Sequence, residues 1–450
     1  MRILSQKWTV WLASVAVALL VGSTGHGQPR SSKSKAKAAA RANAAAAEAE
    51  RGEWSRWRGP RGDGISLETG LLGEWPEEGP PLAWRTKGLG SGYASVSIAG
   101  GTIYTLGKQG DKTFLSARSV ADGSELWRTA VGGGGNPNCT PTVDGDRVYG
   151  LTHGGDLFCC RTEDGALVWS KNYHRDFGAE ETPGWGFSES PLVDGDRLIC
   201  TPGSDRAMLA ALDKRTGETI WTTQAAGDRL GKRGHEGAGY SSIVIGKAGG
   251  VKQYVTLVGK GVIGVEAAGG KLLWSYNAVA NGTACIPTPI VEGDYVFCSS
   301  GYGAGSALLK LQRSAGGFEA EEVYFLAGKQ MQNHHGGMIH KDGFLYCGHG
   351  HNEGFPLCID VKTGRDAWRP GRGPGSGSAA VAYADGRLYF RYQDGTMALI
   401  EATPKQYNLK GKFKIASKNG ESWPHPVIAG GKLYLRDQDE LLCYDVKEKP

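Results

Sequence analysis

The chain carries almost no net charge outside its first 51 residues. The whole sequence has 51 Lys and Arg against 46 Asp and Glu, a formal charge of +5. Eight of the basic residues but only two acidic ones fall within residues 1–51, so the remaining 399 residues hold 43 basic and 44 acidic side chains. A neutral body lacks the basic surface that binds nucleic acid. We therefore expect no nucleic-acid partner.

The common catalytic signatures are also missing. No nucleophile motif, Walker loop or dinucleotide fingerprint stands in a supporting context. The glycine run from Gly132 to Gly135 precedes a predicted strand and not a helix. It therefore does not form a phosphate-binding loop.

The apolar run at the N-terminus, Trp8 to Val21, is short for a spanning helix, which needs about 20 residues. A charged stretch precedes it and small residues follow it, which predicts an export signal over residues 1–27. An uncleaved N-terminal anchor is the alternative, and it is the only route to a membrane. No cysteine follows the run, so the sequence offers no lipidation site there. We expect an exported protein of the periplasm or cell surface.

Residues 28–53 are rich in Ala, Lys and Ser and have no apolar stripe. Such a segment cannot bury a face, so it is predicted to be a linker. Residues 54–81 form a lead-in, and residues 82–450 form the folded body.

The body has an abundance of turn and anchor residues. The sequence contains 71 Gly and 13 Trp, which favours all-β structure. One plan repeats: two short strands joined by a Gly turn, a third strand, a Thr-Gly or Asp-Gly turn, and a strand ending in an aromatic anchor. The anchors are Trp84, Trp127, Trp169, Trp221, Trp274, Tyr324, Trp368 and Phe413.

The spacing of these anchors predicts an all-β, eight-bladed β-propeller of four-stranded blades. The steps are 43, 42, 52, 53, 50, 44 and 45 residues, a period typical of propellers. The eighth copy ends after three strands, so the isolated strand Leu82–Thr86 is expected to complete it and close the ring. Two stacked β-sandwiches are the competing fold, but sandwiches have no reason to repeat one anchor.

At Ala211 to Trp221 the pattern Ala-x-Asp-x-x-Thr-Gly-x-x-x-Trp resembles the tryptophan-docking motif of the pyrroloquinoline quinone (PQQ) repeat family. Residues 358–368 hold a second good copy, and residues 57–64 look like the lead-in of exported bacterial members. The resemblance implies one of two classes. Quinoprotein dehydrogenases oxidise alcohols or sugars with PQQ and calcium, whereas cofactor-free propellers include an outer-membrane assembly factor that scaffolds other proteins.

The inner ends of the blades supply candidate ligand-binding residues at the mouth of the central channel. Aligned copies and neighbouring loops place there Asn138, Trp185, His235, His335, Trp423 and His425. The alternative is that small inner residues only let eight strands converge, and that the loop aromatics plug the channel.

Histidines concentrate in the sixth copy. The low-ranked candidate ligands for zinc or another transition metal are His334, His335, His349, His351 and Glu353. Alternatively, these are loop histidines bonded to neighbouring backbone.

Six of the nine cysteines recur at two equivalent blade positions, which indicates small buried residues. They are Cys159, Cys358 and Cys443 on third strands and Cys200, Cys298 and Cys347 on second strands. A bridge between Cys347 and Cys358 on adjacent strands stays open as an alternative.

The sequence favours a non-enzymatic binding or scaffold protein of the cell envelope, with a protein or envelope ligand as its partner and no assigned cofactor. The alternative is a PQQ-dependent dehydrogenase with calcium. It would need an Asp base, a carboxylate set for calcium and a Trp platform, for which Trp185 and Trp423 are the candidates.

Overall fold

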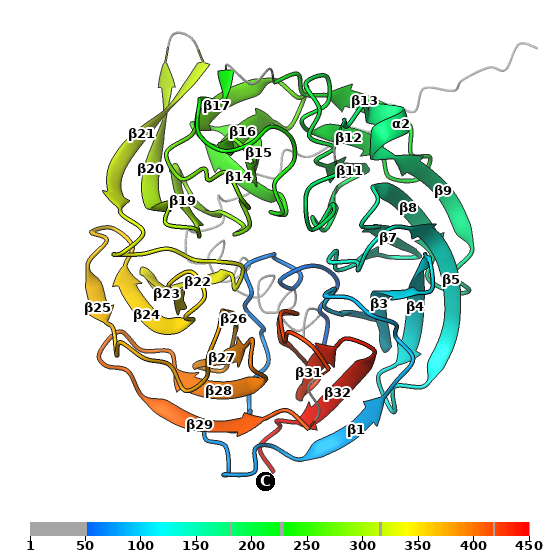
Figure 1. Cartoon of the computed structure of the whole chain (residues 1–450), viewed down its shortest axis with the longest axis vertical. Coiled ribbons are helices and arrows are strands. Elements are labelled where there is room, and N and C mark those ends of the chain that lie inside the picture. Colours follow the sequence, from blue (N-terminus) through cyan, green and yellow to red (C-terminus); the bar gives the residue numbers. More distant parts are fainter. Residues whose placement is uncertain (1–51, 181, 226–228, 315–316, 417–418, 450) are drawn as a thin grey trace, which may run out of the picture. The chain divides into compact units, whose positions relative to one another are not determined.

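The computed structural model describes residues 52–180, 182–225, 229–314, 317–416 and 419–449. Over these residues, eight four-stranded antiparallel sheets form a ring around a central channel (Figure 1). This confirms the eight-bladed propeller and excludes the two stacked sandwiches.

Each blade runs from an inner to an outer strand in chain order, except the last. Blade 1 consists of β2 Ser97–Ala99, β3 Thr102–Gln109, β4 Lys112–Ser119 and β5 Glu125–Gly133, and blade 2 of β6 Thr142–Asp144, β7 Arg147–Leu151, β8 Asp156–Arg161 and β9 Leu167–Asn172. Blade 3 consists of β10 Leu192–Asp194, β11 Arg197–Cys200, β12 Ala210–Asp213 and β13 Thr219–Thr222, and blade 4 of β14 Val244–Ala248, β15 Val251–Val258, β16 Gly261–Glu266 and β17 Leu272–Tyr276. Blade 5 consists of β18 Ile290–Glu292, β19 Tyr295–Ser300, β20 Gly305–Ser314 and β21 Gly317–Leu326, and blade 6 of β22 Met338–Lys341, β23 Phe344–His349, β24 Phe355–Asp360 and β25 Asp366–Trp368. Blade 7 consists of β26 Ala379–Ala384, β27 Arg387–Tyr392, β28 Thr396–Glu401 and β29 Leu409–Lys414, and blade 8 of β30 Val427–Ala429, β31 Lys432–Asp437, β32 Glu440–Asp445 and β1 Leu82–Thr86. The short helix α2, Tyr173–Phe177, follows blade 2.

The N-terminal strand closes the ring as expected. β1 pairs antiparallel with β32, so the last blade combines strands from both ends of the body. Closure in this way leaves no blade with three strands and an open edge.

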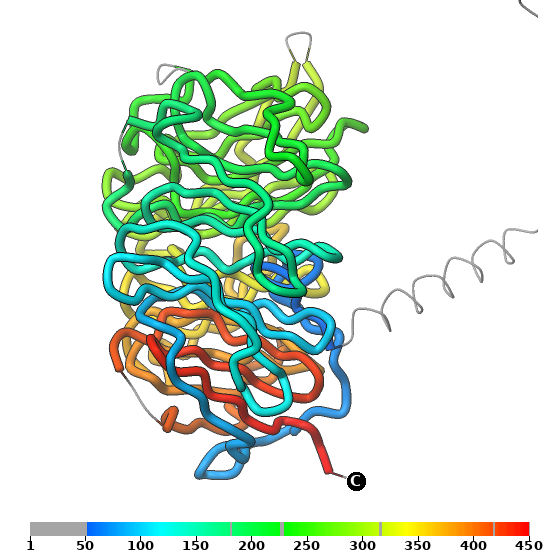
Figure 2. Tube along the Cα trace, turned by 90° about the vertical axis from the view of Figure 1, so that its right-hand side faces the viewer, coloured from blue at the N-terminus to red at the C-terminus, as the bar shows by residue number. Residues whose placement is uncertain are grey.

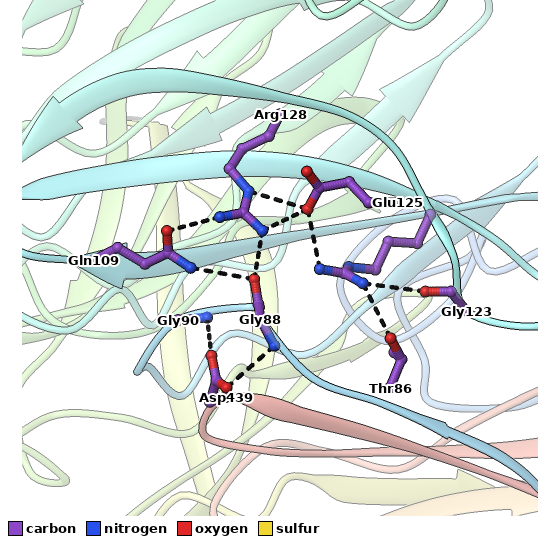
Figure 3. A network of polar contacts seen from close by, with 9 residues as sticks. Thr86, Gly88, Gly90, Gln109, Gly123, Glu125, Arg128 and Asp439 are labelled. Carbon is purple, nitrogen blue, oxygen red and sulfur yellow. Dashed lines mark hydrogen bonds and ion pairs between the residues drawn. The ribbon is translucent and has the colours of Figure 1, made fainter.

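A polar network holds the chain where it leaves β1 for blade 1 (Figure 3). The Asp439 carboxylate in the β31–β32 turn accepts hydrogen bonds from the backbone N–H of Gly88 at 3.1 Å and of Gly90 at 2.7 Å. The Arg128 guanidinium on β5 donates to the Gly88 carbonyl at 2.6 Å and also to Glu125. Blades 8 and 1 belong to separate sheets, and charged groups therefore help to join them at this seam.

The aromatic anchors of most blades pack against the turn of the next one, but Trp274 of blade 4 instead donates through Nε1 to Gln253 of its own blade at 2.7 Å. A Cβ added to Gly165 of blade 2 would lie 2.4 Å from the Trp127 ring of blade 1, so only glycine leaves room for the indole. The Trp127 Nε1 donates to the Thr162 carbonyl at 3.0 Å in the same turn. Equivalent donations to the following blade come from Trp84 to Val120, Trp169 to Lys214, Tyr324 to Val361 and Trp368 to Thr403.

The hydrophobic core lies between the blades. In the cluster between blades 1 and 2, Leu115 packs with Leu157 and Phe158, and all three are fully buried. All nine cysteines are free and buried, which confirms the structural interpretation. The bridge between Cys347 and Cys358 does not form, because the cross-strand partner of Cys358 is Tyr346. Adjacent residues on β23 point to opposite faces, so the two thiols lie in different clusters.

The lead-in crosses the channel and then runs outward to β1. It forms backbone bridges from Trp54 to Ile98 on β2 and from Ile65 to Tyr383 on β26. Farther along, Leu71 bridges Lys447 beyond β32. The dark blue segment accordingly crosses the middle of the ring in Figure 1 and lies along one face in Figure 2. One end of the channel is therefore covered by the chain itself.

The expected export signal and most of the linker lie outside the described residues. Within the described ranges, no helix is long and apolar enough to cross a membrane.

Candidate functional site

A cavity of about 320 Å³ lies in the central channel, with the lead-in at one end of it. Its walls come from loops before the inner strands and between the second and third strands of several blades, and the lead-in forms its floor. The lining residues are Trp57, Arg58, Tyr93, Asn138, Trp185, Ser188, Ser190, Tyr240, Ser242, Ala284, Ile286, Pro287, Thr288, Tyr302, His334, His335, Gly337, His351, Asn352, Gln393, Trp423, Pro424 and His425.

Most of the predicted channel-mouth residues line this cavity. They are Asn138, Trp185, His335, Trp423 and His425. His235 does not line it, because its ring packs against Gly259 and its Nδ1 donates to the Glu236 carbonyl at 2.8 Å. Tyr240, five residues later, takes the place in the wall. His235 lies in the long loop before blade 4, which extends beyond the repeated plan, so the repeat could not place it.

Hydroxyl groups near the cavity join neighbouring inner strands. The backbone N–H of Ser95 donates to Thr140 Oγ1 at 3.2 Å, that of Thr140 to Ser190 Oγ at 3.0 Å, and that of Ser190 to Ser242 Oγ at 2.9 Å. These residues therefore hold strands together, which is the structural interpretation of the small inner residues. The series also shows that Ser242, and not its neighbour Ser241, is the equivalent residue in blade 4.

A hydrogen-bonded chain fixes the ring of His334. The Ser378 hydroxyl donates to the His351 carbonyl at 3.2 Å or to Asn352 Oδ1 at 3.1 Å, so it accepts from His334 Nδ1 at 2.7 Å. The other nitrogen, Nε2, then accepts from the Tyr302 hydroxyl at 3.2 Å. His334 is consequently a neutral imidazole with its proton on Nδ1.

The imidazoles of the cavity are held uncharged. Burial, followed by the neighbouring imidazoles, lowers the pKa of His334 to about 2 and that of His335 to about 3. Burial also lowers the pKa of His425 to about 3 against its hydrogen bond to the His335 carbonyl at 3.0 Å. The cavity therefore presents neutral imidazole rings at physiological pH.

The predicted metal ligands do not all point to one place. The rings of His334, His335 and His351 are adjacent, with centroids 4.5 and 4.3 Å from that of His334. His349 lies outside the cavity lining and its Nδ1 accepts from the Gln332 N–H at 3.3 Å, while Glu353 is exposed.

Across the described ranges, no three His, Cys, Asp or Glu side chains are arranged to hold a metal ion. The metal site stays a prediction. Its test is metal analysis of the wild type, His335→Ala and His349→Ala, in which equal metal content would remove it.

The sequence did not point to several residues of the cavity. The floor is formed by Trp57 and Arg58 of the lead-in, and the wall also includes Tyr302 and Gln393. The Trp57 indole lies on the His425 ring with centroids 4.4 Å apart. No repeat aligns the lead-in with a blade, so only its strongly aromatic and basic composition was a signal.

A family model described as "Outer membrane protein assembly factor BamB" matches residues 111–370, more than half of the chain. The chain belongs to this family of PQQ-like propellers. A curated member from Salmonella typhimurium is 29% identical over 114 residues, which cover 24% of this chain. The aligned part spans only 28% of that relative's length.

Solved structures support the same fold. BamB from Moraxella catarrhalis aligns over 81% of this chain and 99% of its own, with 12% identity and a TM-score of 0.54. A europium-containing methanol dehydrogenase aligns over 88% of this chain and 91% of its own, with 12% identity and a TM-score of 0.62. The propeller is thus shared by BamB-like proteins and by quinoprotein-type enzymes.

Proposed function

We propose that this BamB-like propeller is an exported, non-enzymatic binding protein of the cell envelope that receives its ligand, or a segment of a protein partner, in the central cavity. The cavity carries this proposal. It is closed at one end by Trp57 and open at the other, where the Trp185 side chain is 47% exposed. Aromatic groups at the mouth of a cavity are typical of binding sites. The family's description as an assembly factor supports a binding role.

The second candidate is a PQQ-dependent alcohol or sugar dehydrogenase, which the likeness to a methanol dehydrogenase favours. Calcium takes six to eight oxygen ligands, usually including carboxylates. Among the described residues that line the cavity there is no Asp or Glu. Glu189 stands between two lining residues, but its carboxylate accepts from the Tyr173 hydroxyl at 2.6 Å, inside blade 3. The residues present do not fit a calcium-bound quinone.

The first experiment separates the two candidates. Purified protein is titrated with PQQ and calcium, followed by absorbance and thermal shift, and assayed for dye-linked oxidation of alcohols and sugars. The binding-protein proposal expects no stoichiometric complex and no oxidation. Stoichiometric binding with turnover would replace it with the dehydrogenase.

The second experiment tests whether the mouth contacts a partner. A photo-reactive phenylalanine derivative is placed at Trp185 and, as a matched control, at the exposed Asp146 in the β6–β7 turn at the other end of an inner strand. Irradiation of intact cells that produce the protein naturally should give defined adducts from position 185 only. Equal labelling from both positions, or none from position 185, would overturn the proposal.

A further inference from the structure

The cavity lining carries charge of one sign, which is positive. Among the described residues that line it, Arg58 is the one Lys or Arg, and there is no Asp or Glu. Burial lowers the Arg58 pKa to about 10, which still leaves the guanidinium protonated. A single positive charge therefore stands at the floor of a cavity whose walls carry no carboxylate.

The Arg58 guanidinium is only partly satisfied by the protein. Its Nη2 donates to the backbone carbonyls of Asp63, at 2.9 Å, and of Met338. Its Nε is buried without a hydrogen-bond partner, and the described residues give Arg58 no ion pair. The Asp63 carboxylate instead pairs with Arg61 at 2.9 Å. Arg58 is only 3% exposed, so water also makes little contact with its charge.

An unpaired buried charge is costly, and a charged N–H donor forms a strong hydrogen bond with a carboxylate. The two carbonyls take both hydrogens of Nη2, so a ligand carboxylate would be bound through another guanidinium nitrogen and not as a bidentate pair. One guanidinium balances one negative charge. A phosphate dianion or a molecule with several carboxylates would leave excess negative charge in a cavity with no second cation.

A second donor belongs to His351, which lines the cavity. The Tyr302 N–H donates to His351 Nδ1 at 3.3 Å, so the neutral His351 ring carries its proton on Nε2. The described residues give that N–H no acceptor. A neutral N–H donor adds a hydrogen bond to an anion without adding charge.

The remaining walls combine aromatic rings with neutral polar side chains such as Asn138 and Gln393. Tyr93 and Trp423 stack with ring centroids 4.6 Å apart, and Trp57 closes the floor. A volume of about 320 Å³ lies at the low end of small-molecule sites. The walls thus fit one ring-sized apolar body.

We propose that the cavity binds a single carboxylate carried on an apolar, ring-sized body, with Arg58 as the anchor of the carboxylate. The proposal rests on the proposed function, because it takes the cavity to be the binding site. Two sources share this chemistry: a free aromatic acid and the C-terminal carboxylate of a polypeptide that ends in an aromatic residue.

Calorimetric titration of the full-length protein tests the charge directly. Indole-3-acetate should bind at least about tenfold more tightly than indole-3-acetamide, which has the same shape without the charge. Equal affinities for acid and amide, or binding of neither, would overturn the proposal. This comparison needs no variant, so it holds even if changes at Arg58 prevent folding.

Three further arms sharpen the result. Arg58→Gln should abolish the preference for the acid, and Arg58→Lys should retain part of it. An unchanged preference in Arg58→Gln would overturn the role of Arg58.

A short peptide ending in tryptophan, with a free or an amidated C-terminus, distinguishes the two sources of the carboxylate. Tighter binding of the free peptide than of indole-3-acetate supports a polypeptide terminus, and weaker binding supports a free acid. Adducts at position 185 without any preference for acids would overturn this inference and leave the proposed function intact.

Discussion

The Trp57 indole lies on the His425 imidazole, with ring centroids 4.4 Å apart, and it also contacts blade 5 through a 3.4 Å hydrogen bond to Thr288 Oγ1. The two partners are on blades on different sides of the channel. A side chain from outside the repeat therefore connects blades 5 and 8 at the floor of the cavity.

This position makes Trp57 a structural residue of the channel. Trp57→Ala should lower the free energy of unfolding by about 2 kcal/mol, because the packing of a partly buried indole is lost and the space that it filled stays empty. Trp185→Ala, on the exposed mouth, should change it by less than about 0.5 kcal/mol. Urea unfolding of both variants checks this, and an equal effect of the two would contradict the role of Trp57.

The neutral imidazoles should make the protein sensitive to acid. The folded pKa of about 3 for His335 and His425 lies below the ordinary value of about 6.5, so the unfolded chain binds more protons between these limits. Stability is therefore fully present above about pH 6.5 and falls as the pH drops toward 3. From pH 7 to 5, each ring should cost about 2 kcal/mol.

Urea unfolding at both pH values measures this loss. His335→Gln and His425→Gln should each reduce it. The same loss in both variants as in the wild type would show that other groups cause it.

The fold was predictable because the sequence pattern of one blade repeats eight times along the chain. Eight anchors at a steady period fixed the blades, and the incomplete eighth copy fixed the closing strand Leu82–Thr86. Pleating also fixes which side of an inner strand a residue faces, so Asn138 and His425 could be placed by alignment alone.

The cavity was predictable only where the repeat reaches it. Arg58 occurs once, in a segment without a second copy, and one of its two hydrogen-bond partners, Met338, is 280 residues away in sequence. His235 lies in the long loop before blade 4, outside the repeated strands and turns. Loop geometry depends on contacts across the channel, and a single sequence does not encode these contacts as a pattern.

The seam of the ring depends on a buried arginine. Arg436 is 1% exposed and donates to the Gly90 carbonyl at 3.0 Å, the Ala94 carbonyl at 3.2 Å and Thr105 Oγ1 at 2.9 Å. Arg436→Met should destabilise the protein by about 3 kcal/mol, because it leaves buried carbonyls of blade 1 without donors. Arg365→Met, in an exposed turn, is the control with less than about 0.5 kcal/mol. Chemical denaturation compares the two, and a neutral Arg436→Met would show that the seam is held without this arginine.

The contact between an anchor and the next turn can be isolated with two glycines of blade 2. Gly165 and Gly145 both have positive φ, 71° and 58°, so a change to alanine costs each a similar backbone strain. A Cβ at Gly165 would lie 2.4 Å from the Trp127 ring, whereas a Cβ at Gly145 meets nothing within 4 Å. Gly165→Ala should therefore be more destabilising than Gly145→Ala by about 1 to 3 kcal/mol, and the difference should shrink when Trp127 is also changed to leucine. Equal unfolding free energies for the two single variants would mean that the indole is free to move away, and that docking of the anchor contributes little to joining the blades.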